Sequence, residues 1–272
     1  MPLPEFWNQY RKESKTKRSL FKRPEDPAVV IGNMLKFKNK PEHDGRLKSQ
    51  PVKLKEVNFQ KGKLLNQDEV SKISKHYNFP FVQTKILSYD KLKNSNLQFP
   101  VVLKAVGEKI IHKSELKGVV LNIKDKIELI KNADEMISNF KKQKIELDSF
   151  LIQPFIQTNF ELLVGAFRDP SFGPMVMFGS GGKYVEYIDD TIIRSAYLSD
   201  FDIEKIINNT KIGKIIQGVR GNAPSDINKI KKAIKAVAQM MINHKEITEC
   251  DLNPLVVTDD NNIFAVDVRI KC

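Results

Sequence analysis

Apolar residues recur along this chain with two different periods, and the period changes repeatedly between residue 66 and the C-terminus. Helical spacing occurs over residues 66–78, 126–142, 200–209 and 225–244. In the last of these, one helical face is apolar and consists of Ile227, Ile230, Ile234, Val237 and Met241. Shorter runs typical of strands occupy residues 80–87, 99–106, 117–123, 148–156, 161–168, 173–180, 183–188 and 191–198. Strands and helices in this order, without a strict βαβ rhythm, predict an α+β architecture.

Helix starts are marked by residues that can cap them. Asn66 and Glu69 have the spacing of a capping box, and Ser225 is placed to cap the helix over 225–244. Before residue 62 the chain is polar, basic and interrupted by proline, and only residues 27–37 are apolar enough for a helix. We therefore predict a basic N-terminal extension over residues 1–61 and a folded region over residues 62–272.

The net charge of +12 is concentrated in the first part of the chain. Residues 1–63 hold 16 Lys and Arg against 7 Asp and Glu, a net of +9, which leaves +3 for the remaining 209 residues. A basic segment binds either nucleic acid or an acidic protein surface. Because the aromatic residues are not interleaved as a stacking platform and no nucleic-acid motif occurs, we predict docking on a partner subunit and no nucleic-acid binding.

The sequence also predicts the cellular location of the protein. No apolar run reaches the roughly 18 residues needed to cross a bilayer, so no membrane association is expected. The N-terminus MPLPEFWNQYRKES has no apolar core of a secretory signal, and Cys250 and Cys272 form no spaced pair. These features predict a reduced protein of the cytoplasm.

The C-terminal segment ECDLNPLVVTDDNNIFAVDV is typical of a β-hairpin, with two apolar runs around the polar turn TDDNN. If the turn is centred on Asp260, the antiparallel register pairs Asn253 with Asp267, and Asp251 lies on the same face. Three oxygen ligands on one face suit Mg²⁺, which shares its coordination with substrate phosphates. Geometry alone leaves a solvated hairpin with scattered acids as the alternative.

A second group of candidate residues lies around a loop between two strands. Lys104 interrupts the apolar strand VVLKAV, where a lysine either faces solvent or pairs with an anion. The loop over residues 107–118 carries His112, Lys113 and Ser114 and ends at Gly118, so it has the composition of a loop that folds over a triphosphate. An imidazole nitrogen there could accept a phosphoryl group, although a lone loop histidine is more often a surface group.

Glycine and arginine residues give weaker signals. FGSGGKY (residues 178–184) allows either a tight turn or close approach of the backbone to a ligand. Arg168, Arg194 and Arg220 could each clamp phosphate oxygens with a planar fork of donors.

Four ordered segments together resemble a known family. They are FPVVLKAVGEKIIHKSELKGVVLNI, FRDPSFGPMVMFGSGGKYVEYIDD, IIQGVRGNAPSDI and ECDLNPLVVTDDNNIFAVDVRI. In order and spacing they are similar to the motifs of the ATP-grasp domain, or β subunit, of the NDP-forming acyl-CoA synthetases. The resemblance covers about residues 62–272. It implies an ATP-grasp fold with two α+β lobes, at about 62–155 and 156–272, that hold a nucleotide between them.

The resemblance also implies an activity and a set of site residues. Family members interconvert acid, CoA and ATP with acyl-CoA, ADP and phosphate, and they carry phosphate on histidines. His112, Lys113 and Ser114 match the phosphohistidine loop. The residues that match the nucleotide site are Lys104, Gln153, Phe155, Glu161 and Arg220, and those that match the Mg²⁺ site are Asp251, Asn253 and Asp267. The implied partner is a CoA-binding α subunit, and the implied hetero-oligomer is active only when that subunit is present.

Three departures from the family strings keep other interpretations open. Glu115 replaces an aspartate, Lys117 replaces a glycine, and Pro154 replaces a glutamate in the hinge string IQPF, which leaves the choice between adenine and guanine undecided. One alternative is a nucleotide-binding regulatory or scaffold subunit that no longer transfers phosphate. Another is a ligase that uses acyl phosphate directly, which the histidine of the HKS loop disfavours. The acid that is activated cannot be named from these residues.

Overall fold

The computed structural model describes residues 26–38, 45–50, 52–107, 110, 117–182, 189–219 and 224–272. The chain forms two compact units, Met1–Asp44 and Gly45–Cys272. In the first unit, helix α2 (Asp26–Lys38) confirms the helix predicted over residues 27–37. None of the helices in the described ranges is long and apolar enough to cross a membrane.

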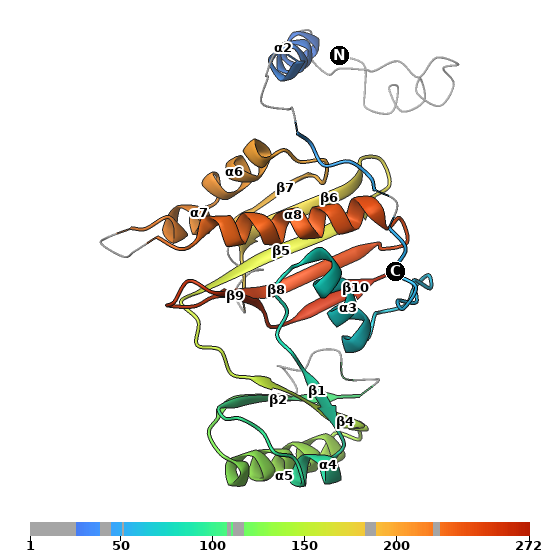
Figure 1. The fold of residues 1–272 in the computed structure, drawn as a ribbon, viewed down its shortest axis with the longest axis vertical. Helices are drawn as coiled ribbons and strands as arrows, with labels where there is room; N and C mark the ends of the chain where they lie inside the picture. The colour runs from blue at the N-terminus through green and yellow to red at the C-terminus, as the bar shows by residue number, and fades with distance from the viewer. Residues whose placement is uncertain are drawn as a thin grey trace, which may run out of the picture. The chain divides into compact units, whose positions relative to one another are not determined.

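A four-stranded antiparallel sheet forms one part of the second unit. Its strand order is β1 (Lys85–Leu87), β4 (Ser149–Pro154), β2 (Val101–Val106) and β3 (Val119–Ile123). Helices α4 (Tyr89–Lys93) and α5 (Lys126–Lys142) cover one face of this sheet (Figure 1). The predicted α5 is confirmed residue for residue, since Asp125 caps its first turn and its buried positions Leu129, Ala133, Met136 and Phe140 follow helical spacing. The opposite face of the sheet is therefore left for other contacts.

A larger sheet carries the C-terminal hairpin. Its order is β10 (Val268–Lys271), β8 (Glu249–Val257), β5 (Phe160–Asp169), β6 (Gly173–Ser180) and β7 (Thr191–Ser195), with β9 (Ile263–Ala265) paired to β8. Helix α8 (Ile227–Asn243) lies across this sheet (Figure 1). The remaining helices of this part are α3 (Gln67–Tyr77), α6 (Asp200–Asn208) and α7 (Lys211–Ile216). Two antiparallel sheets with helices packed against them confirm the predicted α+β class.

The long helix α8 supplies much of the larger core. Ile230, Ile234, Val237 and Met241 are fully buried, as the apolar face predicted. The predicted cap was wrong, however, because the N-cap residue is Asp226 and not Ser225. The Asp226 carboxylate accepts from the backbone N–H groups of Asn228 and Lys229, which places the helix start one or two residues later than predicted.

Strand β1 is shorter than the predicted run over residues 80–87, and the reason is tertiary. The Ala265 N–H donates to the Pro80 carbonyl over 2.8 Å, and the Val82 N–H donates to the Ala265 carbonyl over 3.2 Å. The start of the predicted strand therefore pairs with β9 of the larger sheet, and only Lys85–Leu87 pairs with β4. The predicted strand over residues 183–188 lies outside the described residues.

Residues 45–60 pack on the larger core. The Leu47 N–H donates to the Leu198 carbonyl over 3.0 Å, and Val57 is buried. The division of the chain at residues 61 and 62, and of the folded region into lobes near residue 155, remains a proposal.

Candidate functional site

The register of the C-terminal hairpin is the one that its turn predicts. Leu255 faces Ala265 across β8 and β9, and Leu252 faces Val268 across β8 and β10. The two residue numbers of each pair sum to twice 260, so the same register runs through both ladders. Between the ladders, the Asn253 N–H donates to the Asp267 carbonyl over 3.2 Å. Asn253 is therefore opposite Asp267, and Asp251 follows on the same face two residues away.

Two carboxylates on this face lie close enough to repel each other. Burial is the main cause that raises the pKa of Asp251 to about 6, and the charge of Asp267 adds to it. A divalent cation removes such repulsion, and the two carboxylates and the Asn253 amide provide the hard oxygen donors that Mg²⁺ prefers. The described residues contain no cluster of three or more His, Cys, Asp and Glu that could hold a metal. An Mg²⁺ ion held by the two carboxylates and the amide would take the rest of its octahedral shell from substrate and water.

The glycine-rich turn after β6 contacts this hairpin. The Gly182 N–H donates to Asn253 Oδ1 over 2.9 Å, which fixes the direction of the amide. Gly182 has a φ of +84°, and a Cβ on it would lie 1.7 Å from Glu161 Oε2. Only glycine suits this position, because the conformation is left-handed and the Glu161 side chain fills the space a β-carbon would need. The turn therefore brings the predicted residues Glu161 and Asn253 to one point.

Lys104 reaches the same hairpin from the smaller sheet. Its side chain is 11% exposed, and its Nζ lies 3.2 Å from the Val266 carbonyl oxygen and 3.5 Å from Asp267 Oδ2. The solvent-facing alternative for Lys104 was wrong, because all but the last residue of β2 are buried and the ammonium pairs with an anion of the other sheet. Lys104 thus contacts the hairpin at Asp267, one of the three predicted oxygen ligands.

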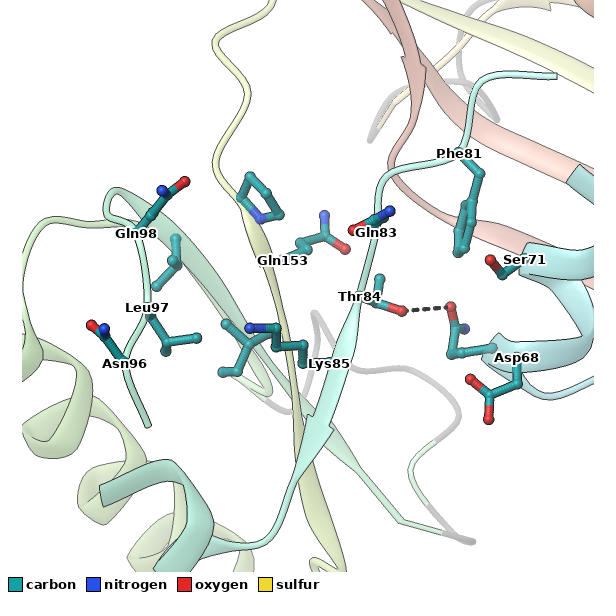
Figure 2. Close-up of a pocket in the computed structure, with 14 residues that line it drawn as sticks. Asp68, Ser71, Phe81, Gln83, Thr84, Lys85, Asn96, Leu97, Gln98 and Gln153 are labelled. Atoms are coloured by element: carbon teal, nitrogen blue, oxygen red, sulfur yellow. Dashed lines mark hydrogen bonds between the residues drawn. The ribbon is translucent and has the colours of Figure 1, made fainter. Parts of the chain in front are cut away.

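The hinge residue Gln153 lines a pocket of about 630 Å³ beside β1. Figure 2 shows Gln153 among the polar side chains that line this pocket, which include Gln83 and Thr84. Thr84 Oγ1 donates to Gln67 Oε1, another residue of the lining. Gln153 is 4% exposed, and its Oε1 has no hydrogen-bond partner among the described residues. A buried unpaired amide oxygen is costly, so this atom is suited to a ligand that donates a hydrogen bond. Phe155, which directly follows the last residue of β4, is half-buried.

All four predicted catalytic residues, His112, Lys113, Ser114 and Arg220, lie outside the described residues. The ends of the histidine loop are described. Strand β2, which carries Lys104, precedes it, and the Ala105 N–H donates to the Gly118 carbonyl over 2.8 Å where it ends. The loop therefore leaves and rejoins the smaller sheet beside Lys104.

Some contributors to the site were not predicted. Arg269 lies directly opposite Asp251, and its charge opposes the rise of the Asp251 pKa. The register that pairs residues 253 and 267 also pairs 251 with 269, so the signal was present in the sequence. The Val266 carbonyl and the Gly182 N–H carried no such signal, since any residue has these groups.

Arg168 does not belong to the site. Its guanidinium donates to the carbonyl of Met241 in the last turn of α8 and to the carbonyls of His244 and Ile247 just after the helix. It satisfies backbone groups that a helix end leaves unpaired, and so it is a structural residue and not a phosphate clamp.

Comparison with known proteins places this geometry in context. The family model described as an ATP-grasp domain matches residues 56–272. An acetate–CoA ligase (ADP-forming) I subunit beta from Pyrococcus furiosus is 33% identical over 211 residues, which cover 76% of this chain and 90% of that protein. A 4-hydroxybutyrate–CoA ligase (ADP-forming) from Nitrosopumilus maritimus is 31% identical over 245 residues, or 88% of this chain. The chain spans about a third of the length of that ligase, 34%.

A solved structure from Ca. Korarchaeum cryptofilum is also similar. It is a dinucleotide-forming acetyl-coenzyme A synthetase, 36% identical, with a TM-score of 0.66 over 77% of this chain and 92% of that one. That protein is in complex with coenzyme A and Mg-AMPPCP, and its phosphohistidine segment points towards the nucleotide binding site.

Proposed function

The chain belongs to the ATP-grasp domain family of ADP-forming acyl-CoA synthetase β subunits, and we propose that it is the nucleotide-binding β subunit of such a synthetase. The complete enzyme would interconvert acid, CoA and ATP with acyl-CoA, ADP and phosphate. The observation that carries the proposal is the meeting of Lys104 from one sheet with the hairpin of Asp251, Asn253 and Asp267 from the other. A cation and a cluster of oxygen ligands at one point suit a metal-bound polyphosphate.

Each predicted residue has a place in this proposal. Asp251, Asn253 and Asp267 would hold Mg²⁺, which when bound neutralises phosphate charge. Lys104 and Arg220 would clamp the phosphates as charge-assisted donors. The residues proposed to contact the rest of the nucleotide are Gln153, Phe155 and Glu161. The unpaired Oε1 of Gln153 supports this part, because a base with an N–H donor would satisfy it.

The transfer step is proposed for the histidine loop. A ring nitrogen of His112 would attack the terminal phosphorus of ATP and form an N–P bond while the P–O bond to ADP breaks. Lys113 and Ser114 would stabilise the transferred group by charge and hydrogen bonding. The phosphoryl group would then pass to a histidine of the CoA-binding partner. The placement of this loop directly after the Lys104 strand supports the assignment.

The regulatory alternative rests on the substitutions at Glu115, Lys117 and Pro154. Lys117 has a φ of +54°, so it adopts the left-handed conformation that the glycine of the family string would adopt without strain. Pro154 is exposed at the end of β4, and the next amide, that of Phe155, still donates to the Pro100 carbonyl over 2.9 Å. Lys117 thus adopts the conformation that a glycine would take, and the backbone after Pro154 keeps a sheet-like hydrogen bond; both observations favour the catalytic proposal.

Reconstitution tests the proposed function. The purified chain alone is expected to bind Mg-ATP or Mg-ADP and to form no acyl-CoA, because the nucleotide residues are present and the acyl and CoA chemistry is proposed for the partner. Addition of a CoA-binding α subunit of the family is expected to give acyl-CoA formation with one of a panel of acids. Calorimetry and thioester detection measure the two properties. Robust thioester formation by the chain alone would refute the proposed division of labour, and absence of nucleotide binding would refute the nucleotide site.

We propose that the extension over residues 1–61 docks on that partner through its first 44 residues, since residues 45–60 pack on the larger core. Helix α2 exposes Val29, Ile31, Met34 and Leu35, and the segment around it is strongly basic. An apolar helix surface among positive charges suits a partner surface that is apolar and rimmed by acids. Association should therefore slow as salt rises, and deletion of residues 1–44 should weaken assembly by about tenfold or more. Unaltered assembly of the truncated chain, or tight binding of the full chain to random duplex DNA at physiological salt, would count against this role.

A further inference from the structure

Lys104 occupies an unusual position for a lysine. It lies in a strand whose other residues are apolar, and its side chain is 11% exposed. Neighbouring strands pair it with Val119 and Leu151, so its own sheet offers it no counter-charge along these strands. Its Nζ instead lies 3.5 Å from Asp267 Oδ2 and 3.2 Å from the Val266 carbonyl oxygen. A buried ammonium is stable only when paired in this way.

The two carboxylates of the hairpin are likewise stabilised by nearby positive charge. Asp251 and Asp267 repel each other, and Arg269 opposes that repulsion from the position opposite Asp251. Asp267 is about half exposed, and among the described residues Lys104 is the cation within ion-pair distance of it. The two cations therefore balance the two carboxylates of the hairpin when no metal ion is bound.

We propose that Lys104 is the counter-ion of the metal-free hairpin and that an arriving divalent cation displaces it from Asp267. The released ammonium then becomes available to a phosphate of the nucleotide. This inference rests on the proposed function, because it takes the hairpin as the metal site. As a consequence, Lys104 should oppose binding of the metal ion alone and should favour binding of the metal–nucleotide complex.

The inference predicts two effects of opposite sign in one variant. In Lys104→Met, an apolar side chain of similar length suits the buried strand. With Mn²⁺ alone as the probe, the variant is expected to bind the ion about fivefold more tightly than the wild type, since one partly exposed ion pair no longer competes. With Mg-ATP as the ligand, the variant is expected to bind at least tenfold more weakly, since a charge-assisted contact to phosphate is lost. A lysine that merely braces the two sheets would give no gain in Mn²⁺ affinity.

A matched control is available elsewhere in the chain. Lys231 on α8 pairs with Glu204 on α6, and the partner carboxylate has nearly the same exposure, 50% against 47% for Asp267. Lys231→Met should leave both affinities unchanged. Lys104→Gln, which keeps a hydrogen-bond donor but no charge, should behave like Lys104→Met and serves if the methionine variant does not fold.

Electron paramagnetic resonance of free Mn²⁺ and calorimetry with Mg-ATP give the two affinities for each purified chain. Tighter Mn²⁺ binding together with weaker Mg-ATP binding supports the exchange. Unchanged or weaker Mn²⁺ binding in both Lys104 variants overturns the proposed exchange. The metal site itself still stands in that case if the Asp251→Ala chain binds Mn²⁺ more weakly than the wild type does. If Asp251→Ala has no effect on Mn²⁺ binding, the hairpin is not the metal site and both proposals fail.

Discussion

His112→Ala is expected to lower ATP formation by the reconstituted enzyme by more than a thousandfold, because it removes the proposed nucleophile. Nucleotide affinity should change little, since the phosphates are held by the hairpin metal, Lys104 and Arg220 in this proposal. The loss should therefore appear as a fall in kcat with nearly constant nucleotide binding. Such a split distinguishes a residue that reacts from a residue that binds.

The pH dependence of the transfer has a defined sign. The attacking ring nitrogen must be neutral, so the rate of phosphorylation should fall as pH decreases through the pKa of the histidine, ordinarily about 6.5. Transfer in the direction of ATP synthesis starts from phosphohistidine and should not show the same loss on that account. In single turnovers, phosphorylation of His112 by ATP and transfer from already phosphorylated His112 to ADP should therefore differ in their pH profiles below neutrality.

Labelled phosphate measures this step directly. The phosphoramidate bond is labile in acid and stable in alkali, so label on the wild-type chain should be lost in acid and kept in alkali. His76→Ala is the control, because His76 is an exposed histidine on α3 with no place in the proposed site. Full activity of His112→Ala would exclude phosphate transfer through His112 and would favour direct transfer or the regulatory role.

The hairpin could be predicted from the sequence because its information is local. A polar turn between two apolar runs sets one register, and a period of two then decides which side chains share a face. For this reason the opposition of Asn253 and Asp267 follows from residue numbers alone, and Arg269 could have been placed opposite Asp251 by the same arithmetic. Helices α3 and α5 were predictable for a similar reason, since caps and apolar spacing agree within each of them.

Contacts between the sheets could not be predicted in this way. From the sequence, the Lys104 side chain could either face solvent or pair with an anion. Only the packing of β2 against the hairpin shows that it pairs with Asp267. The strand predicted over residues 80–87 divides between two sheets because Ala265 pairs with Pro80 and Val82, far away in sequence. The short helices α4 and α7 have too few turns for an apolar period to appear. At the start of α8, Ser225 and Asp226 are adjacent and both are good N-cap residues, so residue type alone could not show that Asp226 is the cap.

Asp251→Ala and Asp267→Ala are expected to weaken Mg²⁺-dependent nucleotide binding by about ten- to a hundredfold each, because each removes one oxygen donor from the proposed metal site. The fold should persist in both. Asp251 has no hydrogen bond to another side chain among the described residues, and Asp267 loses only the partly exposed pair with Lys104. Thermal midpoints should therefore stay within a few degrees of the wild-type value.

Asp259→Ala is the matched control for these variants. Asp259 lies in the exposed turn of the same hairpin, so its removal changes the local charge equally without touching the face of Asp251 and Asp267. Calorimetric titration with Mg-ADP, and with ADP in the presence of a chelator, separates the metal-dependent part of the affinity from the rest. The ligand variants should lose the metal-dependent part alone, whereas the control should keep it. Equal Mg-ADP affinity in all three variants would show that the converging oxygens of this hairpin do not hold the ion, because a lost ligand cannot leave metal-dependent binding unchanged.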